Sequence, residues 1–158
     1  MNPNEIHERL RAAFGAAVIE AKLDALQPWI RIAPEKINAV CQYLFSEGDC
    51  AFDYLMCLSG VDYNNGTLGV VYHLSSIKHR HKIVLKTTCP KDNPHVASVS
   101  MIWGTANWHE REAYDLFGIL FDGHPDLRRI LLPYDWEGHP LRKDYKVQEF
   151  YSGMRVPY

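Results

Sequence analysis

The chain has 158 residues, of which 47% are hydrophobic and 23% charged, and its formal net charge is −2. This length and composition predict one soluble globular domain that is large enough to bury a core. The slightly acidic balance disfavours nucleic acid as a partner. No apolar run approaches the roughly 20 residues that cross a bilayer, and the N-terminus lacks the layout of a signal peptide. Any membrane association is therefore expected to be indirect.

The four cysteines contain no C-x-x-C pair, and their spacing fits neither a zinc site nor an iron–sulfur cluster. Without a secretion signal, we expect them to be reduced and mostly buried, as small hydrophobic residues. They are Cys41, Cys50, Cys57 and Cys89.

The first fifty residues predict two helices. Ile6, Leu10 and Phe14 recur every four residues, which indicates a helix over 4–14 that ends at Gly15. Short strands are expected around Val18 and over 29–32. A second helix is expected to begin at Pro34, because proline suits a first helical turn, and to close at a left-handed Gly48. Its apolar positions predict a buried face: Ile37, Val40, Cys41, Leu44 and Phe45.

The middle of the chain predicts a sheet. Residues 52–61 are nearly all apolar, which favours a central strand. The run Asn64-Asn65-Gly66 predicts a tight turn, and apolar residues then alternate from Leu68 to Leu74. Another strand is expected over 82–88 and a loop over 89–94. Residues 98–103 predict a further strand, with a helix over 95–100 as the alternative.

Residues 108–146 form the densest stretch, with fourteen charged residues, three histidines and two tryptophans in 39 positions. Asn107 is expected to cap a helix, with Glu110 as the acid of a capping box. This helix should end at Gly118, and Arg111 should pair outward with Asp115 at i,i+4. Beyond it, prolines recur every seven or eight residues and remove all periodicity. Such a segment needs another surface to lie on.

The predicted fold class is therefore α+β: a mainly antiparallel sheet with helices on one face, then a short helix and a long extended C-terminal arm. We expect an α+β domain over residues 1–118. Residues 119–158 are expected to form an extended interaction arm, called here the C-terminal arm.

Motifs for phosphate binding, dinucleotide binding and serine hydrolysis are absent from the sequence. His109, His124 and His139, with Asp115 or Asp126, could in principle hold a metal ion and support a metallohydrolase. The alternative is that these histidines hydrogen-bond the backbone at turns. His79 and His81 are expected in a solvated turn.

Carboxylates and cations also offer two interpretations in this stretch. Glu110 and Glu112 point about 160° apart on a helix, so they cannot share a proton as an acid–base pair. Arg128, Arg129, Arg142 and Lys143 could bind an anion, but eight acidic residues lie in the same stretch. Ion pairs within the chain or with a partner are therefore the favoured use of these cations.

The dense stretch resembles a known family. The residues that carry the resemblance are Glu110-Arg111-Glu112, YDLFGI at 114–119, GHPDLRRIL at 123–131, Leu132-Pro133, Asp135-Trp136 and GHPLRKDY at 138–145. They are similar to the signature of the 30 kDa subunit of respiratory complex I, which in bacteria is the C subunit of NADH-quinone oxidoreductase. Lys146 departs from it, because many relatives have proline there.

The resemblance implies a cofactor-free structural subunit in the peripheral arm of a proton-pumping enzyme, on the cytoplasmic side of the cell membrane. That complex passes electrons from NADH through FMN and iron–sulfur clusters to quinone. The subunit would dock on the 49 kDa-type quinone-site subunit and on neighbouring iron–sulfur subunits. The alternative is the equivalent subunit of a membrane-bound hydrogenase or of a quinone oxidoreductase with another donor. The residues expected at the partner interface are Glu110, Arg111, Glu112, Asp115, His124, Arg128, Arg129, Trp136, His139, Arg142, Lys143, Asp144 and Tyr145.

Overall fold

The computed structural model describes residues 1–156 and has a mixed α+β architecture. Three α-helices occur in these residues: α1 (Pro3–Phe14), α2 (Ile37–Ser46) and α3 (Ala106–Phe117). The strands are β1 (Val18–Lys22), β2 (Trp29–Ile32), β3 (Tyr54–Asp62), β4 (Thr67–Ser75), β5 (Lys82–Pro90), β6 (His95–Ala97), β7 (Leu120–Asp122), β8 (Phe150–Tyr151) and β9 (Met154–Arg155). Short 3₁₀ turns follow α1 and precede α2.

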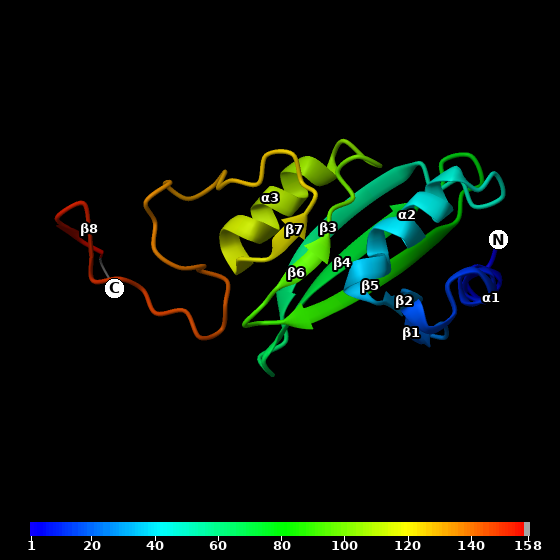
Figure 1. Ribbon diagram of the computed structural model, residues 1–158, viewed down its shortest axis with the longest axis horizontal. Coiled ribbons are helices and arrows are strands. Elements are labelled where there is room, and N and C mark those ends of the chain that lie inside the picture. Colours follow the sequence, from blue (N-terminus) through cyan, green and yellow to red (C-terminus); the bar gives the residue numbers. More distant parts are fainter. Residues whose placement is uncertain (157–158) are drawn as a thin grey trace.

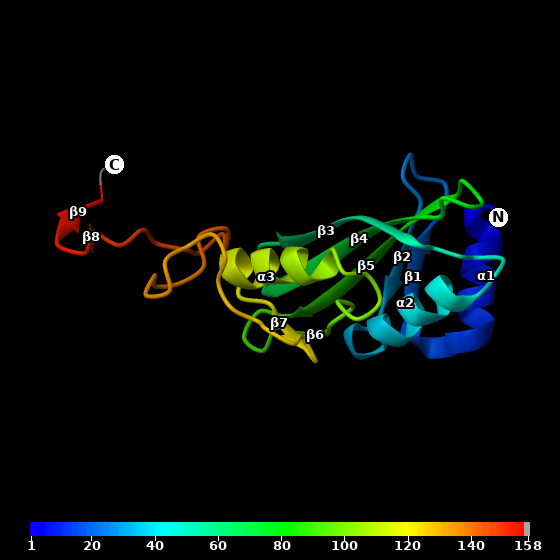
Figure 2. The same cartoon turned by 90° about the horizontal axis from the view of Figure 1, so that it is seen from above.

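Five strands form the main sheet in the order β1-β2-β5-β4-β3. All neighbours are antiparallel except β2 and β5, which run parallel. Helices α2 and α3 lie over one face of this sheet, and α1 stands at one end of it (Figures 1 and 2). The mainly antiparallel sheet with helices over one face agrees with the predicted fold class.

The core lies between the sheet and the helices. Alternate residues of β4 point into it, and Leu68, Val70, Tyr72 and Leu74 are fully buried, as the period-two pattern predicts. Helix α2 adds Val40 and Leu44 from its inner face. Each fully buried residue of this size contributes about 1.5–3 kcal/mol to stability.

Several local predictions are confirmed. Helix α1 ends before Gly15, which has a positive φ of 52°. The turn between β3 and β4 uses positive φ at Asn64 (57°) and Gly66 (82°), which is the backbone that asparagine and glycine tolerate best. The cysteines are mostly buried as expected, and only Cys57 is partly exposed.

Other local predictions are wrong. Strand β3 lies at the sheet edge and not at its centre, because a nearly continuous apolar run does not specify which strands lie beside it. Phe45 is 40% exposed, although its spacing placed it on the buried face of α2. Helix α2 ends at Ser46 with an extended Glu47, and Gly48 does not adopt a left-handed conformation.

The region before α3 also differs from expectation. The strand is β6, over 95–97, and residues 98–105 form turns and irregular backbone and not the predicted strand. His81 is buried and its Nε2 lies 2.7 Å from the carbonyl oxygen of Cys50, so the predicted solvated turn is wrong for this residue. Its ring packs against Phe52, and its Nδ1 lies 3.1 Å from the N-terminal nitrogen of Met1. Both partners are remote in sequence, so the lysine and arginine beside His81 gave no sign of them.

Residues 119–122 pack against the rest of the molecule. Strand β7 pairs in parallel with β6, and both Ile119 and Phe121 are buried. Residues 123–156 are called here the projecting segment. Its first part packs on the body, where the His124 side chain is fully buried and Leu127 contacts the core. Its last part, with β8 and β9, extends away from the body (Figures 1 and 2). The predicted division at Gly118 stays a prediction, and we propose that the interaction arm begins after Asp122.

Candidate functional site

The predicted interface residues gather at helix α3 and the root of the projecting segment. Helix α3 begins at Ala106, and Thr105 precedes it without a side-chain cap. The capping box predicted from Asn107 and Glu110 is therefore wrong, because Asn107 already lies in the first turn. The helix ends as predicted at Gly118, which has a left-handed φ of 71°.

Glu110 is fully buried and holds the irregular segment before the helix. Its carboxylate accepts hydrogen bonds from the Ser98 hydroxyl at 2.6 Å and the Val99 backbone N–H at 2.7 Å. Burial raises the pKa of Glu110 to about 7, although both hydrogen bonds act in the opposite direction. The protonated and ionised forms of this carboxyl are therefore both accessible near neutral pH.

Asp115 is the centre of the contacts between α3 and the projecting segment. Its side chain is fully buried, and Oδ2 accepts backbone N–H bonds from three consecutive residues, Ile130 at 3.0 Å, Leu131 at 2.7 Å and Leu132 at 3.0 Å. Its other oxygen, Oδ1, accepts a hydrogen bond from Nη1 of Arg129 at 2.8 Å. One carboxylate thus fixes four consecutive residues of the projecting segment.

The electrostatics of Asp115 favour its ionised form. Burial alone would raise its pKa, but the three backbone N–H groups and the Arg129 guanidinium outweigh burial, so the pKa is lowered. Arg129 uses its second terminal nitrogen to donate to the carbonyl oxygens of Trp136 at 3.0 Å and Gly138 at 2.9 Å. A single guanidinium therefore joins α3 to two separate turns of the segment.

The side chains of His139 and Arg142, from the projecting segment, cover the turn at Gly118. The Nδ1 atom of His139 lies 2.9 Å from the carbonyl oxygen of Asp115, and Arg142 Nε donates to the carbonyl oxygen of Phe117 at 2.6 Å. A Cβ atom at Gly118 would lie 2.5 Å from the His139 ring and 2.7 Å from the Arg142 guanidinium. Glycine is required here for both its backbone conformation and its small size.

A second acidic side chain holds the segment against the sheet. The Asp62 carboxylate accepts hydrogen bonds from the Lys143 backbone N–H at 2.8 Å, from the Asn64 backbone N–H at 2.8 Å and from Lys91 Nζ at 3.0 Å. Lys91 also forms an ion pair with Asp144 at 2.7 Å. Burial opposes ionisation, but these donors lower the pKa of Asp62 to about 2.

Aromatic side chains order the outer part of the segment. Trp136 Nε1 donates to the Tyr145 hydroxyl at 3.1 Å, and the Trp136 ring lies 5.2 Å from the ring of Tyr151. Gly138 has a φ of 78°, and a Cβ there would lie 2.9 Å from the Tyr145 ring. The segment therefore has internal packing as well as contacts with α3.

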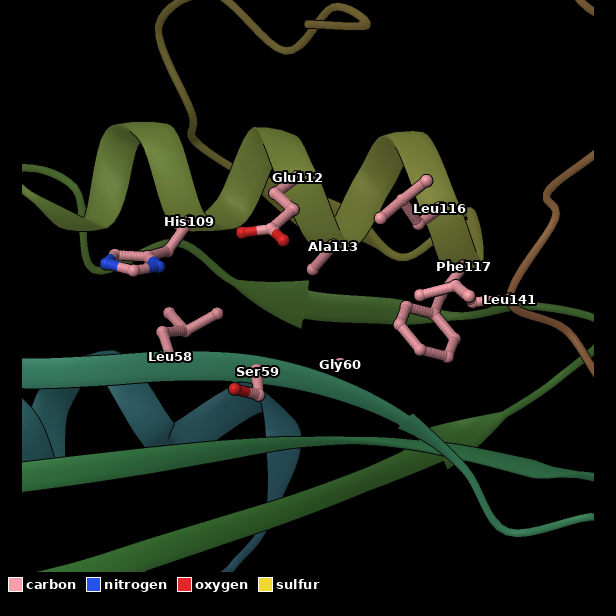
Figure 3. Close-up of a pocket in the computed structure, with 9 residues that line it drawn as sticks. All are labelled: Leu58, Ser59, Gly60, His109, Glu112, Ala113, Leu116, Phe117 and Leu141. Atoms are coloured by element: carbon pink, nitrogen blue, oxygen red, sulfur yellow. The ribbon is translucent and has the colours of Figure 1, made fainter. Parts of the chain in front are cut away.

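The remaining predicted interface residues have separate environments. Arg111 is buried, lies over the Trp108 ring at 4.9 Å and donates to the carbonyl oxygen of Arg128 at 3.3 Å. The predicted outward Arg111–Asp115 pair is therefore wrong, because both side chains turn inward. Arg128 forms an exposed pair with Asp126 at 2.9 Å. Glu112 is exposed on the helix face toward β3 (Figure 3).

The three histidines of the metal hypothesis are used separately. The Asp126 backbone N–H donates to Nδ1 of His124, whose Nε2 lies 3.2 Å from the carbonyl oxygen of Asn107. His139 contacts the backbone of Asp115, and His109 lies in the groove between α3 and β3. Among residues 1–156, no group of three histidine, cysteine or carboxylate residues has the arrangement of a metal site. The geometry supports backbone hydrogen bonding for His124 and His139.

Sequence reasoning missed three residues that hold the site together. Asp62 and Lys91 lie 81 and 52 positions from Lys143, and nothing local marks them as its neighbours. The only signal near Asp62 is the predicted turn that follows it. Ser98 is predicted in a strand, whereas its hydroxyl binds Glu110.

No helix within residues 1–156 is long and apolar enough to cross a membrane.

The sequence comparisons identify relatives over almost the whole chain. Residues 30–151 match the family described as the respiratory-chain NADH dehydrogenase, 30 Kd subunit. The C subunit of NADH-quinone oxidoreductase from Chloroherpeton thalassium is 48% identical and covers 99% of this chain, which spans 66% of that protein. The protein of the same name from Chlorobium phaeobacteroides is 46% identical, covering 96% of this chain and 93% of its own length.

Solved structures show the same fold. The trypsin-resistant fragment (1–134) of Nqo5 matches with a TM-score of 0.64 and 29% identity, over 80% of this chain and all of the fragment. A chain of the membrane-bound sulfane sulfur reductase, an archaeal respiratory membrane complex, matches with a TM-score of 0.74 over 90% of this chain and 85% of its own length. At 23% identity this second match shows the fold alone. With the family match over residues 30–151, these findings confirm the resemblance: the chain belongs to the family of the 30 Kd subunit of the respiratory-chain NADH dehydrogenase.

Proposed function

We propose that this chain is a cofactor-free assembly subunit of a proton-pumping NADH-quinone oxidoreductase, and that the projecting segment docks on a neighbouring subunit. The observation that carries the proposal is the exposure of large apolar side chains along that segment. Leu131 is 60% exposed, Tyr134 94%, Phe150 59% and Met154 66%. Several large apolar side chains left in solvent along one segment favour a surface that another protein covers.

The fixed root of the segment supports docking over disorder. Asp115, Arg129 and Asp62 hold residues 129–143 against the body, so less ordering is needed when a partner binds. A preordered surface loses less conformational entropy on association than a free tail. The exposed residues can therefore add to affinity without first folding the segment.

The proposal includes the setting that family membership suggests. The partner would be the 49 kDa-type quinone-site subunit with adjoining iron–sulfur subunits, on the cytoplasmic side of the membrane. The complex would carry NADH, FMN, iron–sulfur clusters and quinone, and the redox chemistry would belong to it. Support comes from relatives named as C subunits of NADH-quinone oxidoreductase and from the structural role of the charged residues at α3.

The test is assembly of the complex in cells. A chain truncated after Leu132 loses most of the projecting segment. We expect this truncated chain to be absent from the purified complex, and we expect the rate of NADH-dependent quinone reduction to fall. Normal assembly and turnover with this truncated chain would contradict the docking proposal.

A point-variant pair separates docking from folding. The double variant Leu131→Ser/Tyr134→Ser removes two exposed apolar side chains from the segment. The matched control Leu26→Ser/Ile77→Ser alters residues that are 102% and 68% exposed on the body. We expect the first to lose several-fold in retention, since interface side chains of this size contribute about 1–2 kcal/mol or more. Equal retention of both variants would count against the segment as the interface.

A related complex with another electron donor is the second candidate. The observation in its favour is the shared fold with a chain of the sulfane sulfur reductase complex. Purifying the native complex and identifying its subunits and electron donor distinguishes the two. A donor-oxidising subunit that accepts NADH supports the first proposal, and a hydrogenase or other catalytic subunit supports the second.

A further inference from the structure

The outer edge of β3 has unpaired backbone groups. Strand β3 is the last strand of the main sheet and pairs only with β4. The Tyr63 N–H donates to the carbonyl oxygen of Thr67, which sets the alternation of the antiparallel ladder. Ser59 and Val61 therefore bond to β4, whereas Leu58 and Gly60 direct their N–H and C=O groups outward. Within residues 1–156 no backbone group bonds to these outward groups.

This edge borders a groove. A cavity of about 220 Å³ is lined by three consecutive residues of β3 and by the facing side of α3: Leu58, Ser59, Gly60, His109, Glu112, Ala113, Leu116 and Phe117, with Leu141 of the projecting segment. Figure 3 shows α3 running alongside β3, with His109 and Glu112 pointing toward the strand. A strand edge and a helix thus form the two walls of the groove, called here the β3–α3 groove.

The projecting segment limits the groove at one end. The Lys143 backbone N–H bonds to the Asp62 side chain, and the Leu141 N–H donates to the Leu116 carbonyl oxygen. The Phe117 ring occupies the space beside Gly60, where a Cβ would lie 2.6 Å from the ring. The edge of β3 is therefore open at Leu58 and Gly60, and the projecting segment closes the groove on the C-terminal side of Gly60.

The chemistry of the groove matches an extended polypeptide. Outward N–H and C=O groups two residues apart, at 58 and 60, match the spacing of alternate residues in an added strand. Glu112 is exposed and forms no ion pair among the described residues, so it favours a basic side chain in that strand. Ala113 and Leu116 provide the apolar surface beside it.

We propose that an extended segment of a neighbouring subunit, with a lysine or arginine facing Glu112, binds in the β3–α3 groove as a sixth strand beside β3. The occupant is a separate chain, and its identity as a neighbouring subunit rests on the proposed function. Edge strands with unpaired backbone readily accept such a strand. The groove adjoins the root of the projecting segment, so both surfaces would contact the same assembly.

The test uses photo-crosslinking in the assembled complex. A benzophenone amino acid is placed at Ser59 in the groove, at Tyr134 in the projecting segment and at Leu26 as an exposed control. We expect Ser59 and Tyr134 to crosslink to other subunits and Leu26 to give little product. A product at Tyr134 without one at Ser59 overturns the groove proposal and leaves the docking proposal standing. Loss of both products overturns both proposals, and a Ser59 product with a second copy of this chain overturns the stated occupant.

Hydrogen exchange distinguishes strand addition from simple covering. In the isolated chain the amides of Leu58 and Gly60 should exchange rapidly, while those of Ser59 and Val61 are slow because they bond to β4. On assembly we expect the Leu58 and Gly60 amides to slow on the order of 100-fold or more. Unchanged exchange at both amides in the assembled complex overturns strand addition.

Two matched charge-reversal variants test whether a basic side chain of the bound strand faces Glu112. Glu112→Lys and Glu8→Lys make the same charge change at exposed helical glutamates, the second on α1. We expect Glu112→Lys to lower the Ser59 crosslinking yield about two- to fivefold, the range of an exposed ion pair, and Glu8→Lys to leave it unchanged. Equal yields would overturn the basic side chain as the partner of Glu112.

Discussion

Replacement of Asp115 by asparagine tests the structural centre of the site. The wild-type carboxylate accepts three backbone N–H bonds on Oδ2 and one guanidinium bond on Oδ1. Asparagine keeps only one acceptor oxygen, and its amide N–H₂ would face either these N–H groups or the Arg129 guanidinium. Both arrangements place donor against donor in a buried site. Removing one partner of a buried ion pair costs about 3–5 kcal/mol.

The lost free energy should weaken the attachment of the projecting segment more than it lowers the stability of the whole domain, because the donors all belong to residues 129–132. A loss of about 3 kcal/mol corresponds to more than about a 100-fold change in a local opening equilibrium. Hydrogen exchange of the Ile130, Leu131 and Leu132 amides measures this opening. We expect these amides to exchange at least about 100-fold faster in the variant at neutral pH.

The control is Asp126→Asn, the same change at an exposed carboxylate paired with Arg128. Its expected cost is below about 1 kcal/mol. The pH dependence has a defined sign. The folded-state pKa of Asp115 is lowered, so its contribution is present above the ordinary carboxyl pKa and is lost as the pH falls through the lowered pKa. Wild-type exchange rates for the three amides in Asp115→Asn would refute the role of this carboxylate.

Two further predictions concern stability. The pKa of buried Glu110 is raised from 4.5 to about 7, so the folded state binds the extra proton and the stability of the wild type falls as the pH rises between these values. Glu110→Gln should remove this pH dependence, which amounts to about 3 kcal/mol in total. Denaturation measured from about pH 4.5 to 8 tests this, and equal slopes for the two proteins would contradict it. Gly118→Ala combines left-handed strain with overlap on His139, whereas Gly123→Ala at φ 83° meets open space. We expect urea denaturation to show Gly118→Ala as the less stable by at least about 1 kcal/mol, and equal losses would mean that the close contact is unimportant.

In residues 108–146, local sequence patterns predict where the helix ends but not which residues its charged side chains contact. The end of α3 at Gly118 was predictable, because a left-handed glycine after a periodic segment is a local property of the backbone. The partners of Glu110, Arg111 and Asp115 were not predictable. A helical wheel assigns charged residues to solvent by default. Here the partners are Ser98, Arg128 and Arg129, which lie outside the helix and 12 to 17 positions away in sequence.

The order of strands in the sheet likewise could not be predicted from local sequence patterns. The alternation in β4 and the turn at Asn64–Gly66 were both readable, since they depend on neighbours within a few residues. The position of β3 at the edge and the parallel pairing of β2 with β5 depend on which strands meet after folding. A run of apolar residues is compatible with either a central or an edge position when a helix covers its exposed side, as α3 does for β3.

By itself the sequence determined the helices, the hairpin turn, the α+β class and the family signature over residues 110–145, because each depends on local periodicity or on a long ungapped motif. Only the tertiary structure decided that Asp115 and Asp62 fix the projecting segment and that β3 leaves an open edge beside α3. The physical reason is that a buried carboxylate and an exposed one are the same letter in a sequence. Their hydrogen-bond donors, supplied by residues up to 81 positions away, determine which role each performs.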